Sequence, residues 1–398
     1  MIVARLELTD FRNYAHASVE LGPGVTVVLG PNGQGKTNLV EAIGYLASGS
    51  SHRVSADPAL VRFGEATATV RATLRHGERE VLMECQINRS GSNRLLVNRS
   101  QVRGREAQRY IDSVLFAPED LAIVRGEPSG RRRVIDALLV AITPRLSGVM
   151  SDYDRVVRQR TTLLKSARAS RVPADALGTL DIWDERLADL GAQIMVARDD
   201  LVAQLLPRVD AAYQRIAGTE QRVALSMTTT IDWRAGAEGE DPVGLRRDAS
   251  AEPAEPARST PSRGMADTRQ RLLDVIAESR RAELDRAVTL VGPHRDDLFI
   301  ELNGLPARGY ASHGESWSLA LSLRLASAEL LRDTGAAGDP VVILDDVFAE
   351  LDEGRRGRLL EAVVGFEQVI VTAAVAGDVP DLDAARVIRI RAGEVVDE

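Results

Sequence analysis

Apolar residues form short runs and helical stripes near both ends of the chain, and this pattern predicts two halves of an α/β domain. Residues 25–29 are almost all apolar, as in a buried strand, and residues 38–46 then carry apolar side chains at helical spacing. Near the other end, residues 340–346 read PVVILDD, an apolar run closed by two aspartates. That run predicts a second buried, parallel strand with acid at its carboxyl end.

The middle of the chain changes from strands to helices. Residues 67–101 alternate in short runs separated by glycine turns, which predicts a β-meander. Residues 143–170 and 178–217 predict two helices of roughly 40–60 Å, separated by Val172-Pro173 and packed antiparallel as a short arm. A strand is expected in 222–231 and a further helix in 269–284, with the chain returning to the α/β domain at Thr289.

Residues 236–267 are rich in Ala, Glu, Pro, Arg and Ser and contain almost no large apolar residue. Such a composition cannot bury enough apolar surface to fold, so it predicts a flexible insertion.

A glycine-rich loop joins the first strand to its helix. It reads GPNGQGKT, a complete G-x-x-x-x-G-K-[ST] phosphate loop in the strand–loop–helix context that the motif requires. Lys36 is expected to reach the β- and γ-phosphates of a nucleoside triphosphate, and the Thr37 hydroxyl to ligate Mg²⁺. The predicted nucleotide-binding residues are Gly30, Pro31, Asn32, Gly33, Gln34, Gly35, Lys36, Thr37 and Asn38.

The two aspartates that end the late strand complete this prediction. Open α/β sheets place their chemistry at the carboxyl ends of strands. Asp345 is expected to hold the Mg²⁺ directly or through water, as a second metal residue beside Thr37. Asp346 is expected to orient or deprotonate the attacking water, so Lys36, Asp345 and Asp346 are the predicted catalytic residues.

Two further segments resemble motifs of the ABC-type ATPases. Residues 310–315 read YASHGE and precede a long amphipathic helix, which looks like the signature motif, and residues 349–352 (AELD) resemble the D-loop. The order of phosphate loop, long insertion, signature, acidic strand and D-loop carries the likeness. It implies that Ser312, Gly314 and Glu315 meet the ATP of a second subunit and that Asp352 belongs to the D-loop.

Longer strings narrow the resemblance to the RecF family of bacterial DNA replication and repair proteins, an SMC-like branch of these ATPases. The strings are LTDFRNY (8–14), SSHR (50–53), FAPEDL (116–121), GEPSGRRRVID (126–136) and VGPHRDDL (291–298). This chain departs from the family at His313, Glu315 and Trp317, where glutamines and a basic residue are usual. Asp346 replaces the glutamate usual in ABC-type ATPases, which fits slow hydrolysis.

The resemblance implies an ABC-type ATPase head with an N-terminal β-meander and an inserted short helical arm. The head would comprise residues 1–142 and 289–398, and the arm 143–288. It also implies ATP and Mg²⁺ as cofactors and a homodimer that closes on double-stranded DNA or on its junction with single-stranded DNA when ATP binds. RecR and RecO would be partners in loading the recombinase, and hydrolysis, weak and stimulated by DNA, would release the clamp.

Charge and composition limit how DNA could be held. The 398-residue chain has a net charge of −8, so contact with DNA requires a local basic surface. Arg125, Arg131, Arg132 and Arg133 are the first candidates, and Arg103, Arg105 and Arg109 are weaker ones. One cysteine, no leader and no apolar run of membrane-spanning length predict a cytoplasmic protein without disulfides.

Two other functions remain open from the sequence. The ATPase subunit of a membrane transporter would share the nucleotide motifs, although the inserted arm argues against it. A structural, arm-mediated tether with little hydrolysis would share the whole architecture and would differ only in turnover.

Overall fold

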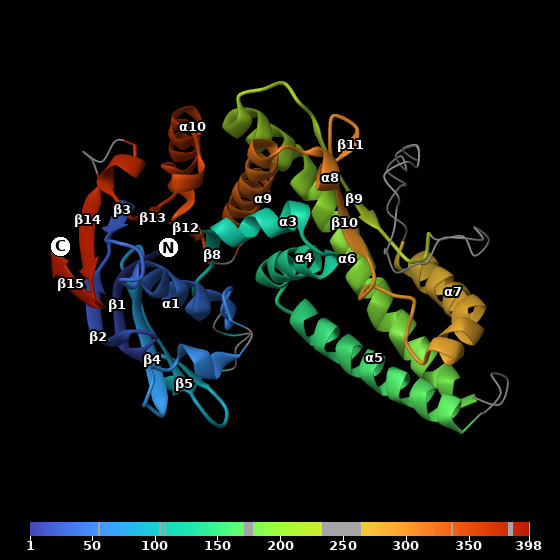
Figure 1. Ribbon diagram of the computed structural model, residues 1–398. Coiled ribbons are helices and arrows are strands. Elements are labelled where there is room, and N and C mark those ends of the chain that lie inside the picture. Colours follow the sequence, from blue (N-terminus) through green and yellow to red (C-terminus); the bar gives the residue numbers. More distant parts are fainter. Residues whose placement is uncertain are drawn as a thin grey trace. The chain divides into compact units, whose positions relative to one another are not determined.

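The computed structural model describes residues 1–54, 56–102, 106, 109–170, 178–232, 264–335, 337–380 and 385–397. The chain divides into two compact units. The head unit contains residues 1–124, 208–221 and 312–398, and the helical unit contains residues 125–207 and 222–311. Figure 1 shows the elements of both. Most of the expected insertion at 236–267 lies outside the described residues, as does Val172-Pro173.

The first sheet of the head unit is antiparallel and contains the predicted meander. Its strand order is β2-β1-β4-β5-β6-β7, so the N-terminal hairpin extends the meander at one edge. Alternate side chains of β1 and β4 are buried, because one face of the sheet covers the core. The strands are β1 (Ile2–Phe11), β2 (Tyr14–Glu20), β4 (Thr67–His76), β5 (Arg79–Asn88), β6 (Arg94–Val97) and β7 (Ser100–Gln101).

The second sheet of the head unit has the order β15-β14-β3-β13-β12-β8. All neighbouring pairs are parallel except the edge pair of β14 and β15. The strands predicted at the two ends of the chain, β3 and β12, both pair with β13. The bounds are β3 (Gly24–Leu29), β8 (Ser113–Phe116), β12 (Val341–Asp345), β13 (Gln368–Ala373), β14 (Arg386–Arg391) and β15 (Glu394–Asp397).

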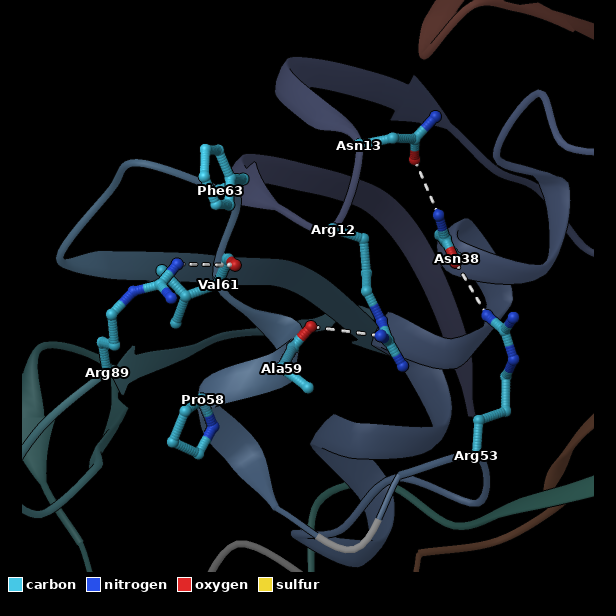
Figure 2. A pocket seen from close by; sticks show the side chains of 9 residues that line it. All are labelled: Arg12, Asn13, Asn38, Arg53, Pro58, Ala59, Val61, Phe63 and Arg89. Carbon is cyan, nitrogen blue, oxygen red and sulfur yellow. Dashed lines mark hydrogen bonds between the residues drawn. The ribbon is translucent and has the colours of Figure 1, made fainter.

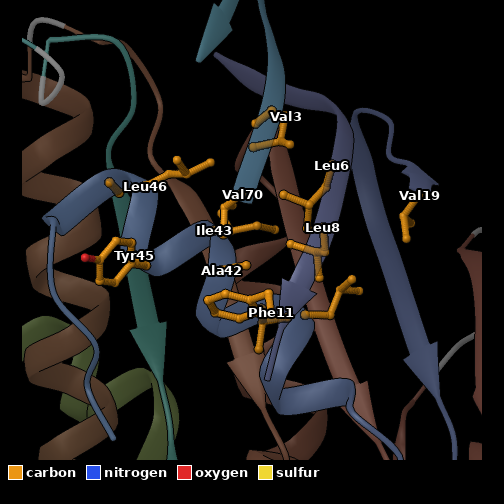
Figure 3. Close-up of a cluster of buried hydrophobic side chains, with 14 of the residues drawn as sticks. Val3, Leu6, Leu8, Phe11, Val19, Ala42, Ile43, Tyr45, Leu46 and Val70 are labelled. Atoms are coloured by element: carbon orange, nitrogen blue, oxygen red, sulfur yellow. The ribbon is translucent and has the colours of Figure 1, made fainter. Parts of the chain in front are cut away.

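Helix α1 (Lys36–Ser48) joins the two sheets through a shared core. Its apolar residues pack with Leu6, Leu8 and Phe11 of β1, as Figure 3 shows, and the same cluster includes Ile343 of β12. Because α1 follows the glycine-rich loop directly, this core fixes the loop at the end of β3. The other helices of the head unit include the short η1 (Asp57–Leu60), α9 (His313–Thr334), α10 (Glu353–Val363) and the last turns of α6 (Gly178–Ala217).

The helical unit confirms the predicted helices and strand of the middle region, with α5 (Leu146–Ala169) shorter than the expected stretch. Its hydrophobic core contains residues of α5, α6 and α7 (Met265–Arg286). The two helices that the sequence predicted to pack together therefore pack with a third. Strand β9 (Val223–Thr228) pairs with β10 (Asp297–Leu302), which pairs with β11 (Leu305–Pro306). Helices α4 (Pro128–Ile142) and α8 (Ala307–Tyr310) also belong to this unit.

A buried ion-pair network crosses the core of the helical unit. The Arg160 side chain of α5 has no solvent exposure, and it donates to Asp184 of α6 at 2.7 Å and to Glu283 of α7 at 2.5 Å. Arg160 also donates to the Thr289 hydroxyl at 3.2 Å. A buried guanidinium requires such carboxylate partners, because without them its charge would be buried uncompensated.

This division differs from the ranges 1–142, 143–288 and 289–398 expected from the sequence. Helix α4 and strand β10 group with the helical unit, because Arg131 of α4 forms two hydrogen bonds of 2.7 Å with Asp297 of β10. The last turns of α6 group with the head, where Arg215 pairs with Glu329 of α9 at 2.6 Å. Long-range ion pairs such as these are not visible in the periodicity of a sequence.

Candidate nucleotide site

The phosphate loop lies between the carboxyl end of β3 and the start of α1, as the sequence predicts. Two of its glycines are required by close approach. A Cβ at Gly30 would lie 2.3 Å from the Ile390 carbonyl oxygen. Gly35 has φ of 120°, and a Cβ there would meet the Tyr14 hydroxyl at 2.8 Å. The backbone of the loop therefore tolerates only glycine at these points.

Neighbouring turns hold the loop from behind. The Asn13 amide donates to the Gln34 carbonyl at 3.0 Å, and the Tyr14 hydroxyl donates to the Gly35 carbonyl at 3.0 Å. From the β14–β15 turn, the Gly393 N–H donates to the same Gln34 carbonyl at 3.0 Å. With its carbonyls engaged in this way, the loop is preorganised to bind an anion through its N–H groups and the start of α1.

Lys36 lies inside the loop, and its side chain is 3% exposed. Its Nζ donates to the Pro31 carbonyl and to the Asn32 side chain, both at 3.4 Å, and lies 3.9 Å from an Asp346 carboxylate oxygen. Hydrogen bonds of this length are weak. The ammonium is therefore held at the loop by contacts that a phosphate oxygen would readily replace.

Asp345 meets Thr37 although 308 residues separate them in the chain. One Asp345 carboxylate oxygen accepts hydrogen bonds from the Thr37 hydroxyl at 3.1 Å and from the Thr372 hydroxyl at 2.6 Å. Burial raises the pKa of Asp345 to about 6, since the two hydroxyl bonds only partly offset the desolvation. The structure thus brings together the two residues predicted to hold Mg²⁺.

Asp346 adopts a left-handed backbone conformation with φ of 51°. The Thr372 hydroxyl stabilises it by accepting a hydrogen bond from the Asp346 N–H at 3.0 Å. A non-glycine residue in this region is strained, and such strain persists where the surroundings hold it in place. The two consecutive carboxylates therefore point in different directions, that of Asp345 toward Thr37 and that of Asp346 toward Lys36.

Sequence reasoning missed Thr372, which lies at the carboxyl end of β13. The strand register pairs it directly with Asp345. Its signal was a polar residue near the carboxyl end of an apolar run, Val369 to Val371. The roles of Asn13 and Tyr14 were also missed, although both lie in a string used for the family resemblance.

The predicted signature loop is the N-terminal cap of α9. The Ser312 hydroxyl accepts from the Glu315 N–H at 3.3 Å, and the Glu315 carboxylate accepts from the Ser312 N–H at 2.8 Å, which is a capping box. Hydrogen bonds from Gln221 and Ser312 lower the pKa of Glu315. The carboxylate of Glu315 is thus engaged in shaping its own loop.

Arg355 connects the signature loop with the predicted D-loop. Asp352 caps α10 by accepting from the Arg355 N–H at 2.9 Å, and its carboxylate also accepts from the Arg355 guanidinium at 2.9 Å. The same guanidinium lies so close to Gly314 that a Cβ there would meet it at 2.8 Å. The two loops therefore share one cationic side chain, which the sequence analysis had not singled out.

The arginines proposed for DNA contact separate into two groups. Arg131 is 4% exposed, and both of its hydrogen bonds to Asp297 lie within the helical unit. Arg132 donates to the Asp296 carbonyl at 2.6 Å. The Arg131 guanidinium therefore holds α4 against β10, and Arg132 ties α4 to the residue just before that strand. Arg125 and Arg133 are exposed.

Arg109, from the weaker basic candidate, is exposed as well. Arg103 and Arg105 lie outside the described residues. Among the described residues, no helix is long and apolar enough to cross a membrane, and no three His, Cys, Asp or Glu side chains gather as a metal site.

Comparisons with known proteins identify the family to which this chain belongs. The chain matches the RecF/RecN/SMC N terminal domain over residues 2–394. It is 57% identical over 397 residues to the DNA replication and repair protein RecF of Clavibacter michiganensis, covering 100% of this chain and 96% of that one. It is 54% identical to the RecF of Leifsonia xyli, with both chains covered completely.

Solved structures agree with the sequence relatives. A structure described as the recombination mediator protein RecF-ATPrS in the RecFOR pathway superposes with a TM-score of 0.83 at 27% identity, covering 99% of this chain and 97% of that one. An SMC head bound to the C-winged helix domain of ScpA shares the fold, with a TM-score of 0.52 at 15% identity over 100% of this chain and 97% of that one. The chain therefore belongs to the RecF/RecN/SMC family, and within it to the RecF proteins of DNA replication and repair.

Proposed function

We propose that this protein is an ATP-dependent DNA-binding protein of recombinational repair and replication-fork maintenance. The observation that carries the proposal is the contact of Thr37 with Asp345 at the mouth of the phosphate loop. It joins two motifs from opposite ends of the chain in the arrangement that binds a nucleoside triphosphate with its metal ion. Relatives described as RecF-ATP and RecF-ATPrS support ATP as the nucleotide.

Mg²⁺ fits the residues at this site. Asp345 is 4% exposed and accepts hydroxyl hydrogen bonds from Thr37 and Thr372, and no cation among the described residues forms an ion pair with it. Mg²⁺ commonly uses one or two carboxylates together with substrate phosphates and waters. Thr37 and Asp345 would hold the ion against the β- and γ-phosphates, and the ion would neutralise charge that develops there during hydrolysis.

Asp346 would position the attacking water. It is the next residue after Asp345, and its side chain faces the Lys36 ammonium across 3.9 Å. Aspartate is one methylene shorter than the glutamate usual at this position, so it would hold the water less closely. The proposed enzyme is accordingly a weak ATPase, and its stimulation by DNA is proposed from the resemblance to the RecF family.

The signature loop would act on the ATP of a second subunit. Ser312 lies at the N-terminus of α9, a helix of 22 residues whose first turn presents backbone N–H groups and the positive end of the helix dipole. Ser312 and Gly314 would contact the γ-phosphate of the partner's ATP, while Glu315 maintains the loop and Asp352 belongs to the D-loop. Two heads would then enclose two ATP molecules in a homodimer.

ATP-driven closure of this dimer would clamp double-stranded DNA or its junction with single-stranded DNA without sequence preference, and hydrolysis would release it. Exposed arginines such as Arg125 and Arg133 would contact phosphates. The relatives' RecFOR pathway supports work with RecR and RecO in loading the recombinase. The proposed location is the cytoplasm.

A transporter ATPase subunit is disfavoured by the full-length identity to DNA repair proteins. A structural tether with little hydrolysis shares the architecture, and turnover measured with and without duplex DNA separates it from the proposed enzyme.

The sandwich arrangement predicts complementation between two inactive variants. Lys36→Met should lose ATP binding, because its charge contacts phosphate, and should keep its helical circular dichroism signal. Ser312→Arg should still bind ATP in its own loop but should hydrolyse little, because both composite sites of its homodimer carry the arginine in place of the signature serine. In an equal mixture half of the dimers are heterodimers with one intact composite site of two, so about a quarter of the parental ATPase rate should return.

Ser90→Arg is the matched control, since Ser90 is exposed in a turn of the β-meander. This variant should hydrolyse at the parental rate. Full activity of Ser312→Arg alone would contradict hydrolysis across a dimer interface.

The raised pKa of Asp345 predicts how Mg²⁺ binding depends on pH. The ion requires the carboxylate, so its affinity for the ATP complex should be constant well above pH 6 and fall by up to about tenfold per pH unit below it. Asp345→Asn should bind Mg²⁺ weakly and lack this part of the pH dependence. Protonation of ATP itself affects both proteins equally, so the comparison of the two corrects for it. Identical pH profiles for Mg²⁺ titrations of the two proteins would assign the ion to other groups.

In the absence of Mg²⁺ and nucleotide, Asp345 affects the stability of the protein in the opposite direction, so that its contribution falls as the pH rises. Burial favours the protonated Asp345, so its contribution to stability is complete below the ordinary pKa near 3.8 and decreases as the pH rises through about 6. Asp345→Asn resembles the protonated form and should gain thermal stability over the parent as the pH increases.

The two groups of arginines predict different effects on DNA binding. Arg133→Ala should lower the slope of log affinity against log salt by about one and leave the melting temperature unchanged. Arg131→Ala should instead destabilise the helical unit by about 2 kcal/mol, because hydrogen bonds to charged groups have this worth, and should leave the salt slope unchanged. The reverse result would place Arg131, not Arg133, on the DNA.

A further inference from the structure

A guanidinium lies against the signature loop of the head unit. A Cβ added at Gly314 would lie 2.8 Å from Nη1 of Arg355 and 3.2 Å from its Nη2, so the end of this side chain is in contact with the glycine. Arg355 belongs to the first turn of α10, where Asp352 caps the helix by accepting from the Arg355 N–H. The loop that is proposed to receive a triphosphate therefore has beside it a cation that neither Ser312 nor Gly314 supplies.

The guanidinium of Arg355 has donors to spare. Among the described residues it donates only to Asp352, from Nη1 at 2.9 Å, and its buried Nε lacks an acceptor. The Asp352 side chain is 57% exposed, and an ion pair with so exposed a carboxylate contributes little to stability. A guanidinium presents five N–H donors in a planar fork that matches the oxygens of a phosphate group. Arg355 can therefore bind a phosphate at little cost to its present contacts.

The charge of the signature loop gives such a cation a purpose. Hydrogen bonds from Gln221 and Ser312 lower the pKa of Glu315, so the loop carries a carboxylate. A negative charge at this position repels a triphosphate. The positive charge of Arg355 also lowers the pKa of Glu315, which shows that the two groups interact. Arg355 thus offsets an acidic group that would otherwise oppose phosphate binding at this loop.

The arginines beside the phosphate loop are occupied by an acid of their own subunit. Figure 2 shows Arg53 bonded to Asn38, with Arg12 in the same pocket. Arg12 forms hydrogen bonds of 2.8 and 2.6 Å with Glu41, whose side chain has no solvent exposure, and Arg53 lies 3.6 Å from the same carboxylate. Lys36 is then the side-chain cation that the phosphate loop holds for its own ATP. A second cation for the γ-phosphate is available on the facing subunit.

We propose that Arg355 is a catalytic residue that contacts the γ-phosphate of the ATP held by the partner subunit. The inference rests on the proposed function and adds to it a cation that acts together with the signature loop. Closure that brings Gly314 to the partner's ATP also brings the Arg355 guanidinium, because the two are in contact. During hydrolysis charge spreads over the γ-phosphate oxygens, and an arginine supplied from a second subunit stabilises that charge. Turnover is thereby tied to closure of the dimer.

The first test separates contact with phosphate from a structural tie between the two loops. Arg355→Ala should lower turnover at saturating Mg-ATP by about a hundredfold, the effect of losing one transition-state donor, and leave the Kd for Mg-ATP in its own loop unchanged. Asp352→Asn removes the ion pair but keeps an oxygen that caps α10, so its turnover should stay within about threefold of the parent. Arg79→Ala, at an exposed arginine of the β-meander, is the matched control and should resemble the parent in both measurements.

Equal losses of turnover in Asp352→Asn and Arg355→Ala would overturn the inference, because Arg355 would then act only by tying the signature loop to the D-loop. Parental turnover of Arg355→Ala would overturn it as well.

Mixtures of variants show which subunit's ATP Arg355 serves. Arg355→Ala mixed equally with Lys36→Met should recover about a quarter of the parental rate, because each heterodimer keeps one intact phosphate loop facing an intact Arg355. Arg355→Ala mixed with Ser312→Arg should stay inactive, because both changes lie on the signature side of the site. An arginine that acts on the ATP of its own subunit gives the opposite result in both mixtures, which would overturn the inference.

The mixture of Lys36→Met with Ser312→Arg distinguishes failure of this inference from failure of the proposed function. If that mixture recovers activity while the two Arg355→Ala mixtures give the opposite results, the two-headed site stands and the role of Arg355 is overturned. If Ser312→Arg alone hydrolyses ATP at the parental rate, the proposed function itself fails.

Discussion

The burial of one carboxylate, that of Asp345, organises the head unit. Asp345 concludes β12, beside the carboxyl ends of the parallel strands β13 and β8. Thr37 and Thr372 hydrogen-bond to it, and Thr372 also holds the strained backbone of Asp346. Burial destabilises the ionised form of this carboxylate, and Mg²⁺ bound together with ATP would stabilise that form.

The rest of the head extends this arrangement outward. Helix α1 carries the phosphate loop and is fixed by a core shared with both sheets. At a separate place in the same unit, Arg355 lies against Gly314 and pairs with Asp352, so the signature loop and the D-loop are tied together. Gln221, just beyond the end of α6, donates to Glu315 at 3.1 Å. A substitution at Arg355, Asp352 or Gln221 would therefore alter the conformation of the signature loop, which is proposed to contact the partner's ATP.

Much of this could be predicted from the sequence because the signals are local. The glycine-rich loop, the strand ending in Asp345 and the helices of the middle region follow from periodicity and motif order, and the family resemblance is confirmed. Contacts between distant residues could not be predicted in this way. The pairing of Arg131 with Asp297 joins residues that are 166 positions apart, and Thr372 was found at the site only through strand register.

The account's central claim is that ATP closes two heads on each other. It is tested most directly by measuring the mass of the protein in solution by light scattering with ATP, with ADP and without nucleotide, each with and without duplex DNA. The account predicts the 43.1 kDa mass of one chain without nucleotide or with ADP, and twice that mass with ATP, most fully when DNA is present. A single-chain mass with ATP and DNA, or a dimer that ignores the nucleotide, would contradict it.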